Sequence, residues 1–84
     1  MVRCATVALP AFDHEIDVRG LTCPMPALRA RSALRRMKSG QVLRVLATDR
    51  ESPRDFARFA RETGNALLAQ TATRREFAFY LRKA

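Results

Sequence analysis

The sequence predicts a two-layer α/β sandwich, in which two helices cover one face of a mixed, four-stranded sheet. Three observations lead to this prediction. The chain has 84 residues, which is enough for one hydrophobic core and too short for two. Apolar residues alternate with polar ones in four short segments and recur at helical spacing in two longer ones. The segments follow one another as strand, helix, strand, helix, strand, strand, and right-handed crossovers place both helices on the same face.

The first strand is predicted over Glu15–Val18, where apolar and polar side chains alternate. Ile16 and Val18 fall on the same side of this strand and are expected to face the core. The strand ends before Gly20, since glycine adopts backbone conformations that a β-carbon forbids and interrupts regular structure.

The first helix is predicted to begin around Cys23-Pro24, because proline is favoured in the first turn. Gly40 is its expected C-terminal cap. The helix has a predicted buried face of apolar residues at helical spacing, namely Ala27, Ala30, Ala33, Leu34 and Met37. A second strand is predicted over Gln41–Thr48. Its core-facing side chains are expected to be Leu43, Val45 and Ala47.

The second helix has a predicted start at Ser52, which is expected to cap it, while Pro53 suits the first helical position. Asp55 stands where the acidic residue of a capping box belongs, and Gly64 is predicted to end the helix. The apolar stripe of this helix is Phe56, Phe59, Ala60 and Thr63. Its solvent-exposed side chains are expected to be Arg54, Arg58 and Arg61.

The last two strands are predicted over Ala66–Thr73 and Glu76–Arg82, and their closeness in sequence indicates a hairpin. In the second of them, the side chains expected to face the core are Phe77, Phe79 and Leu81. The side chains expected to face outward are Glu76, Tyr80 and Arg82.

Residues 1–13 are predicted to form a flexible N-terminal arm, and residues 14–84 a single domain. Sixteen Lys and Arg against eight Asp and Glu give a formal charge of +8, which favours acidic partners but does not specify a function. No apolar stretch approaches the roughly 20 residues of a membrane span. Only Cys4 and Cys23 are present, so the sequence excludes a disulfide framework and favours the reducing cytoplasm.

Cys23 is the candidate reactive residue, because it lies where the first strand leads into the first helix. Unpaired N–H groups and the helix dipole favour a thiolate there, so its pKa is expected to lie modestly below the ordinary value of about 8.5. Nearby Arg19 and Arg29 are expected to add to this effect. Pro24 and Pro26 have a fixed φ and lack N–H groups, so they are expected to start the helix rigidly and hold the thiol in place.

The segment Asp17-Val18-Arg19-Gly20-Leu21-Thr22-Cys23-Pro24-Met25-Pro26 resembles the signature of the TusA-like (SirA-like) sulfur carriers, in which Cys-Pro-x-Pro follows Asp-x-Arg-Gly-Leu. The resemblance implies a sulfurtransferase that accepts sulfane sulfur as a persulfide on Cys23 and passes it to an acceptor protein. It also implies a cysteine desulfurase or a rhodanese-like protein as donor. No cofactor or metal is implied, because thiol and persulfide exchange directly.

Three groups of residues near Cys23 are candidates for supporting the site or for binding a partner protein. Gly20, with the two prolines, is expected to support the site. Asp17 and Arg19 either orient the cysteine loop or form an ordinary ion pair at the strand end, and both interpretations stay open. Partner docking is predicted at three residues near the start of the first helix that face away from its buried side, Met25, Leu28 and Arg29.

Two other functions stay open on the sequence alone. The first is a basic regulatory module that binds acidic proteins or nucleic acid through its arginine-rich helices, although no aromatic residue lies among these arginines to stack on bases. The second is a thiol redox sensor, which requires Cys4 or a partner cysteine to resolve it. Cys4 is otherwise interpreted as an incidental thiol and His14 as a surface residue, and the two cysteines and one histidine lie too far apart to predict a metal site.

Overall fold

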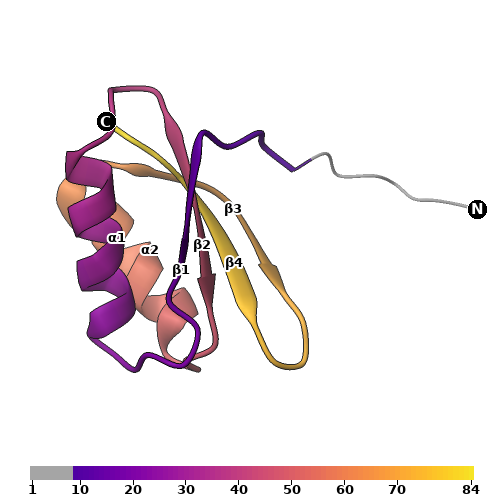
Figure 1. Cartoon of the computed structure of the whole chain (residues 1–84). Helices are drawn as coiled ribbons and strands as arrows, with labels where there is room; N and C mark the ends of the chain where they lie inside the picture. The colour runs from indigo at the N-terminus through magenta and orange to yellow at the C-terminus, as the bar shows by residue number, and fades with distance from the viewer. Residues whose placement is uncertain (1–8) are drawn as a thin grey trace, which may run out of the picture.

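The computed structural model describes residues 9–84 and shows the six predicted elements in the predicted order (Figure 1). They are β1 (His14–Asp17), α1 (Met25–Arg35), β2 (Val42–Ala47), α2 (Ser52–Thr63), β3 (Ala66–Ala72) and β4 (Phe77–Arg82). The first eight residues of the predicted N-terminal arm, and Cys4 with them, lie outside the described residues. No helix in residues 9–84 is long and apolar enough to cross a membrane.

The four strands form one mixed sheet in the order β1-β2-β4-β3. β1 and β2 are parallel neighbours, with Ile16 opposite Val45, whereas β4 runs antiparallel to both β2 and β3. Both helices lie on the same side of this sheet (Figure 1). The predicted two-layer α/β sandwich is therefore confirmed.

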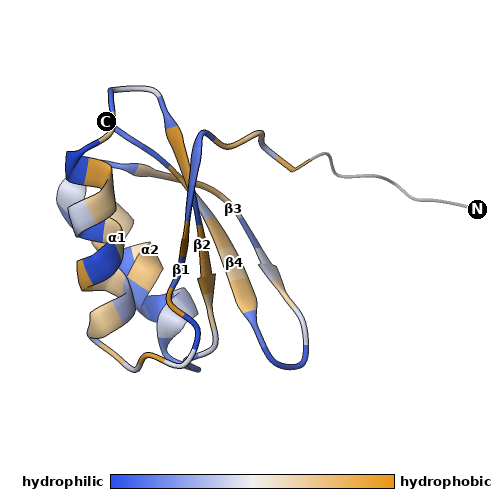
Figure 2. Cartoon of the chain, viewed as in Figure 1, coloured by the Kyte–Doolittle hydropathy of each residue, from blue (hydrophilic) through white to orange (hydrophobic). Residues whose placement is uncertain are grey.

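The hydrophobic core fills the space between the helices and the sheet. The residues that line it most completely are Val18, Ala30, Leu34, Leu43, Val45, Ala47, Phe56, Phe79 and Leu81, each at most 2% exposed. Figure 2 shows apolar residues along β2 and β4 and a hydrophilic turn between β3 and β4. The core-facing residues predicted for β2 are confirmed, because alternate positions of a strand face the same side. On α2 the predicted stripe is confirmed for Phe56 and Phe59, whereas Ala60 and Thr63 are only partly buried.

Two predicted helix caps are wrong. α1 ends at Arg35, where the backbone N–H groups of Arg36 and Met37 turn back to carbonyls three residues earlier and tighten the last turn. Gly40 instead lies in the turn before β2 with a φ of +87°. At the start of α2 the capping position is Glu51, and no side chain caps the helix. Ser52 is the first helical residue and is buried, and its hydroxyl has no hydrogen-bond partner in residues 9–84.

The outer face of the sheet is covered in part by the segment that precedes β1. Tyr80 lies on this face as predicted, yet it is only 3% exposed. The guanidinium of Arg44 lies 5.4 Å from the ring centroid of Phe12 and 5.9 Å from that of Tyr80. Arg44 also donates a hydrogen bond to the Tyr80 hydroxyl at 3.1 Å and pairs with Glu15. Burial of Tyr80 thus comes from Phe12 and Arg44 rather than from the core.

Candidate functional site

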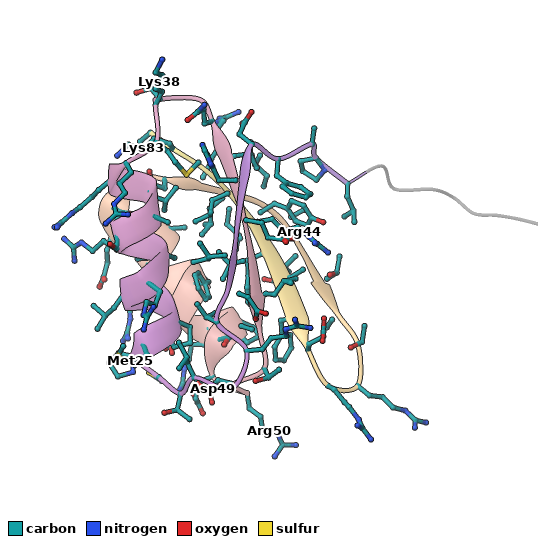
Figure 3. All side chains as sticks on the ribbon, in the orientation of Figure 1. Met25, Lys38, Arg44, Asp49, Arg50 and Lys83 are labelled. Atoms are coloured by element: carbon teal, nitrogen blue, oxygen red, sulfur yellow. The ribbon has the colours of Figure 1, made fainter. Side chains whose placement is uncertain are left out.

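Two connections meet where the parallel strands β1 and β2 end. Parallel neighbours place their carboxyl ends at the same edge of a sheet, and such edges commonly hold the functional groups of α/β folds. The first connection, residues 18–24, leads into α1 and contains Cys23; the second, residues 48–51, leads into α2. Figure 3 shows Met25 and Asp49 together at this end of the molecule, with Lys38 and Lys83 at the opposite end.

Hydrogen bonds join the two connections. The backbone N–H of Gly20 donates to Thr48 Oγ1 at 2.9 Å, and the backbone N–H of Cys23 donates to Asp49 Oδ2 at 3.0 Å. Gly20 has a φ of +85°, a left-handed conformation that strains any residue with a β-carbon. The cysteine loop is therefore held at both ends by the connection that follows β2.

The start of α1 contains both prolines of the predicted motif. Pro24 occupies the capping position and Pro26 the second helical position, where neither needs an N–H group. The side chain of Pro26 is buried, and the backbone N–H of Met25 donates to the Thr22 carbonyl at 2.8 Å. The helix thus begins at Met25, two residues after Cys23 and close to the predicted start at Cys23-Pro24.

The side chain of Cys23 is exposed at a groove between α1 and α2. This groove has a volume of about 150 Å³. Residues of both helices line it together with the cysteine, namely Pro24, Ala27, Leu28, Arg31, Asp55, Arg58, Phe59 and Glu62. A thiol in this position is open to a reagent from solvent and stands beside an apolar surface that a partner's side chain could enter.

The electrostatic surroundings of the thiol differ from the prediction. The pKa of Cys23 is raised, first by a hydrogen bond to the Asp55 carboxylate, then by partial desolvation and by the negative charges of Asp55, Asp49 and Glu51. The predicted lowering of this pKa is wrong, because it considered only the start of α1 and the nearby arginines. The first turn of α2 and the connection before it bring three carboxylates to the same place.

Arg19 does not supply the positive charge that the sequence suggested. Its guanidinium pairs with Asp17 at 2.8 Å and with Glu76 at 3.4 Å, while its backbone N–H donates to Asp17 Oδ1 at 3.0 Å. The Arg19 guanidinium lowers the pKa of Asp17 to about 2. The two residues form the ion pair at the end of β1 that was one of the two interpretations, and this pair also links β1 to the start of β4.

The three residues predicted for partner docking lie in different places around α1. Leu28 is 50% exposed and lines the groove beside Cys23. Met25 is 38% exposed at the first residue of the helix. Arg29 lines a separate hollow over β1, together with Asp17 and Arg36. The structure therefore brings Leu28 to the groove wall, next to the thiol.

Asp49 and Asp55 are the site residues that the sequence did not reveal. Asp55 was interpreted as part of a capping box, but its side chain faces the groove, is only 12% exposed and has Arg58 at 3.8 Å. The predicted topology could have indicated Asp49. When β1 and β2 are parallel neighbours, an acidic residue that follows β2 lies near the end of β1. No group of three His, Cys, Asp or Glu side chains in residues 9–84 is arranged to hold a metal ion.

Known proteins are similar to this chain in sequence and in fold. The sequence profile of the family described as sulfurtransferase TusA matches residues 14–83. The chain is 48% identical over 73 residues to the sulfur carrier protein TusA of Allochromatium vinosum, which covers 87% of this chain and 96% of that protein. A candidate sulfur carrier of Neisseria meningitidis serogroup A is 57% identical over 56 residues, or 67% of this chain and 76% of that protein.

The solved structure of a SirA-like protein from Desulfitobacterium hafniense has the same fold. It aligns with a TM-score of 0.67 and covers 83% of this chain and 96% of that chain. The two sequences are 23% identical, so this likeness concerns the fold alone.

Proposed function

Because this chain belongs to the TusA family of sulfur carriers, we propose that Cys23 is the residue that carries the sulfur. Cys23 accepts sulfane sulfur from a donor protein as a persulfide and passes it to an acceptor protein, which makes the chain a sulfurtransferase. The observation that carries this proposal is the exposed thiol of Cys23, which lines the groove between α1 and α2 and whose backbone N–H is hydrogen-bonded to Asp49.

The transfer needs one nucleophile and no net oxidant. Cys23 Sγ, as the thiolate, attacks the outer sulfur of the donor persulfide, and a new S–S bond forms on Cys23. The S–S bond of the donor breaks at the same time, and its inner sulfur leaves as a thiolate that takes up the proton released from Cys23. The acceptor cysteine then attacks the outer sulfur on Cys23 in the same way, and the Cys23 thiol is restored.

The carboxylates around Cys23 moderate the reactivity of the free carrier. Asp55 and its acidic neighbours favour the protonated thiol, which is neither a nucleophile nor readily oxidised. The free thiol therefore reacts more slowly at neutral pH than a thiol with an unshifted pKa would.

Partner proteins dock at the end of the molecule where Cys23 lies, because the two sulfur atoms must come into contact. Leu28 provides an exposed apolar side chain on the groove wall, and Met25 and Arg29 flank it on α1. Asp17, Arg19 and Gly20 support the loop from the β1 side. The donor is a cysteine desulfurase or a rhodanese-like protein, and the cytoplasm supplies the reducing conditions that keep the thiol free.

Mass spectrometry of Cys23→Ser tests this proposal. After incubation with glutathione persulfide, the wild-type chain is expected to gain one sulfur atom on Cys23, and the variant is expected to gain none there. Cys4→Ser is the matched control, since it removes the other thiol and should load like the wild type. Equal sulfur uptake by Cys23→Ser and the wild type would show that Cys23 is not the carrier residue.

A further inference from the structure

Asp49 connects the residue that carries the thiol to the rest of the fold. Its carboxylate Oδ2 accepts the hydrogen bond from the backbone N–H of Cys23 at 3.0 Å, across 26 positions of sequence. Its own carbonyl accepts a hydrogen bond from the Ser52 N–H at 3.0 Å, at the start of α2. Asp49 therefore ties the cysteine to the end of β2 and to the first turn of α2 at once.

Packing does little to hold Cys23 in place, because its side chain is exposed. Sulfur transfer nevertheless requires the attacking and the attacked sulfur atoms to be aligned at about 3–3.5 Å. A hydrogen bond from an N–H group to a carboxylate is among the stronger kinds in proteins, since its acceptor is charged. The Asp49 carboxylate is thus suited to fix the position of an exposed residue.

We propose that Asp49 is a positioning residue for sulfur transfer, which holds the backbone of Cys23 so that the thiol stands at a fixed place beside the groove. This inference rests on the proposed function of Cys23. The Asp49 carboxylate binds the main chain and does not take part in the transfer itself. Its role is to limit the orientations from which Cys23 Sγ attacks the outer sulfur of a donor.

The charge of Asp49 and its hydrogen bond act in opposite directions on the reaction. The negative charge contributes to the raised pKa of Cys23, so removing it increases the thiolate fraction. Loss of the hydrogen bond instead loosens the loop. Asp49→Asn removes the charge but keeps a side-chain oxygen that accepts the Cys23 N–H, whereas Asp49→Ala removes both. Comparing these two variants separates the effect of the hydrogen bond on sulfur transfer from the effect of the charge.

The experiment measures loading of Cys23 from glutathione persulfide as a function of pH, together with hydrogen exchange at the Cys23 amide. On the high-pH plateau every thiol is ionised, so pKa differences no longer matter. There we expect Asp49→Ala to load roughly tenfold to a hundredfold more slowly than the wild type, and Asp49→Asn to stay within about twofold of it. Exchange at the Cys23 amide should be faster in Asp49→Ala alone.

A matched control is offered by Asp13. Its Oδ2 accepts the backbone N–H of Val42 at 2.9 Å, a bond of the same kind at the opposite end of the parallel strands. Asp13→Ala should lower stability about as much as Asp49→Ala does but should load at the wild-type rate. Equal slowing by both variants, or an Asp49→Ala plateau equal to that of Asp49→Asn, would overturn the inference.

The outcomes also separate this inference from the proposed function. A wild-type chain that takes up no sulfur disproves the carrier role of Cys23. In that case iodoacetamide replaces the persulfide as the probe, and its plateau rate and the Cys23 amide exchange still decide whether Asp49 positions the thiol. Unchanged amide exchange in Asp49→Ala contradicts the positioning role whatever the sulfur chemistry.

Discussion

Truncation of Phe56 to alanine should remove a large part of the stability of the domain. Phe56 is fully buried on α2, its ring stacks on Phe79 with centroids 4.5 Å apart, and it meets the edge of Phe59 at 6.2 Å. Removing a buried phenylalanine side chain typically costs about 3–5 kcal/mol of unfolding free energy. A domain of 84 residues has a total of only about 4–13 kcal/mol, so the variant should lose between roughly a quarter and all of its stability.

Urea denaturation followed by far-ultraviolet circular dichroism measures this loss, since the chain has no tryptophan to report on unfolding. Thermal unfolding should show a Tm lower by at least about 12 °C, at roughly 4 °C or more for each kcal/mol in a domain of this size. Phe12→Ala is the matched control, because Phe12 is 45% exposed and makes one aromatic contact, with Tyr80. It should cost about 1 kcal/mol. Equal losses for the two variants would refute the assignment of Phe56 to the core.

Three further predictions concern the site and its support. Asp55→Asn should lower the pKa of the Cys23 thiol, because it removes the carboxylate that most favours the protonated form; iodoacetamide should then alkylate Cys23 faster at neutral pH. The pKa of Asp17 is about 2 in the folded chain against an ordinary value of 3.8, so its pair with Arg19 stabilises the fold above about pH 4. This contribution should disappear as the pH falls from 3.8 to about 2, and Arg19→Gln should abolish that part of the acid dependence of unfolding. Leu28→Asp should slow sulfur loading from a donor protein far more than loading from a small polysulfide, as measured by mass spectrometry.

Two of these predictions have a control variant within the chain. Glu62 also lines the groove but is not among the causes of the raised thiol pKa, so Glu62→Gln should leave the alkylation profile unchanged. Leu68 is 38% exposed on β3, and Leu68→Asp should not affect donor discrimination. A slower alkylation of the Asp55→Asn variant, or equal slowing of both donors by Leu28→Asp, would contradict the corresponding prediction. Acid unfolding of Arg19→Gln that follows the wild-type curve would contradict the role of the Asp17 ion pair.

The fold could be predicted from the sequence because its signals are local. Alternating residues such as Leu43, Val45 and Ala47 identify a strand that is buried on one face, and the handedness of the crossovers then fixes the side on which the helices lie. The helix caps at Gly40 and Ser52 could not be predicted in the same way. Packing against the core decides where the first turn of α2 begins, and it buries Ser52 instead of leaving it at the capping position.

Only the part of the site that lies within one continuous segment, around Cys23, could be predicted from the sequence. Cys23 stands out through its adjacent prolines and its place before a helix, and the structure confirms that place. Asp49 and Asp55 are 26 and 32 positions away, and they act on Cys23 only because β1 and β2 are parallel neighbours. The sign of the thiol pKa shift depends on these distant carboxylates, so local reasoning from the helix dipole gave the wrong direction.

The hydrogen bond between Asp49 and the backbone of Cys23 has a consequence for protein engineering. The bond holds the main chain and leaves the sulfur atom free of the scaffold. Selenocysteine, serine or alanine should therefore fit at position 23 with the loop geometry unchanged. The side chain at position 23 can therefore be exchanged without moving the loop, so that nucleophiles of different strength can be compared in the same protein environment.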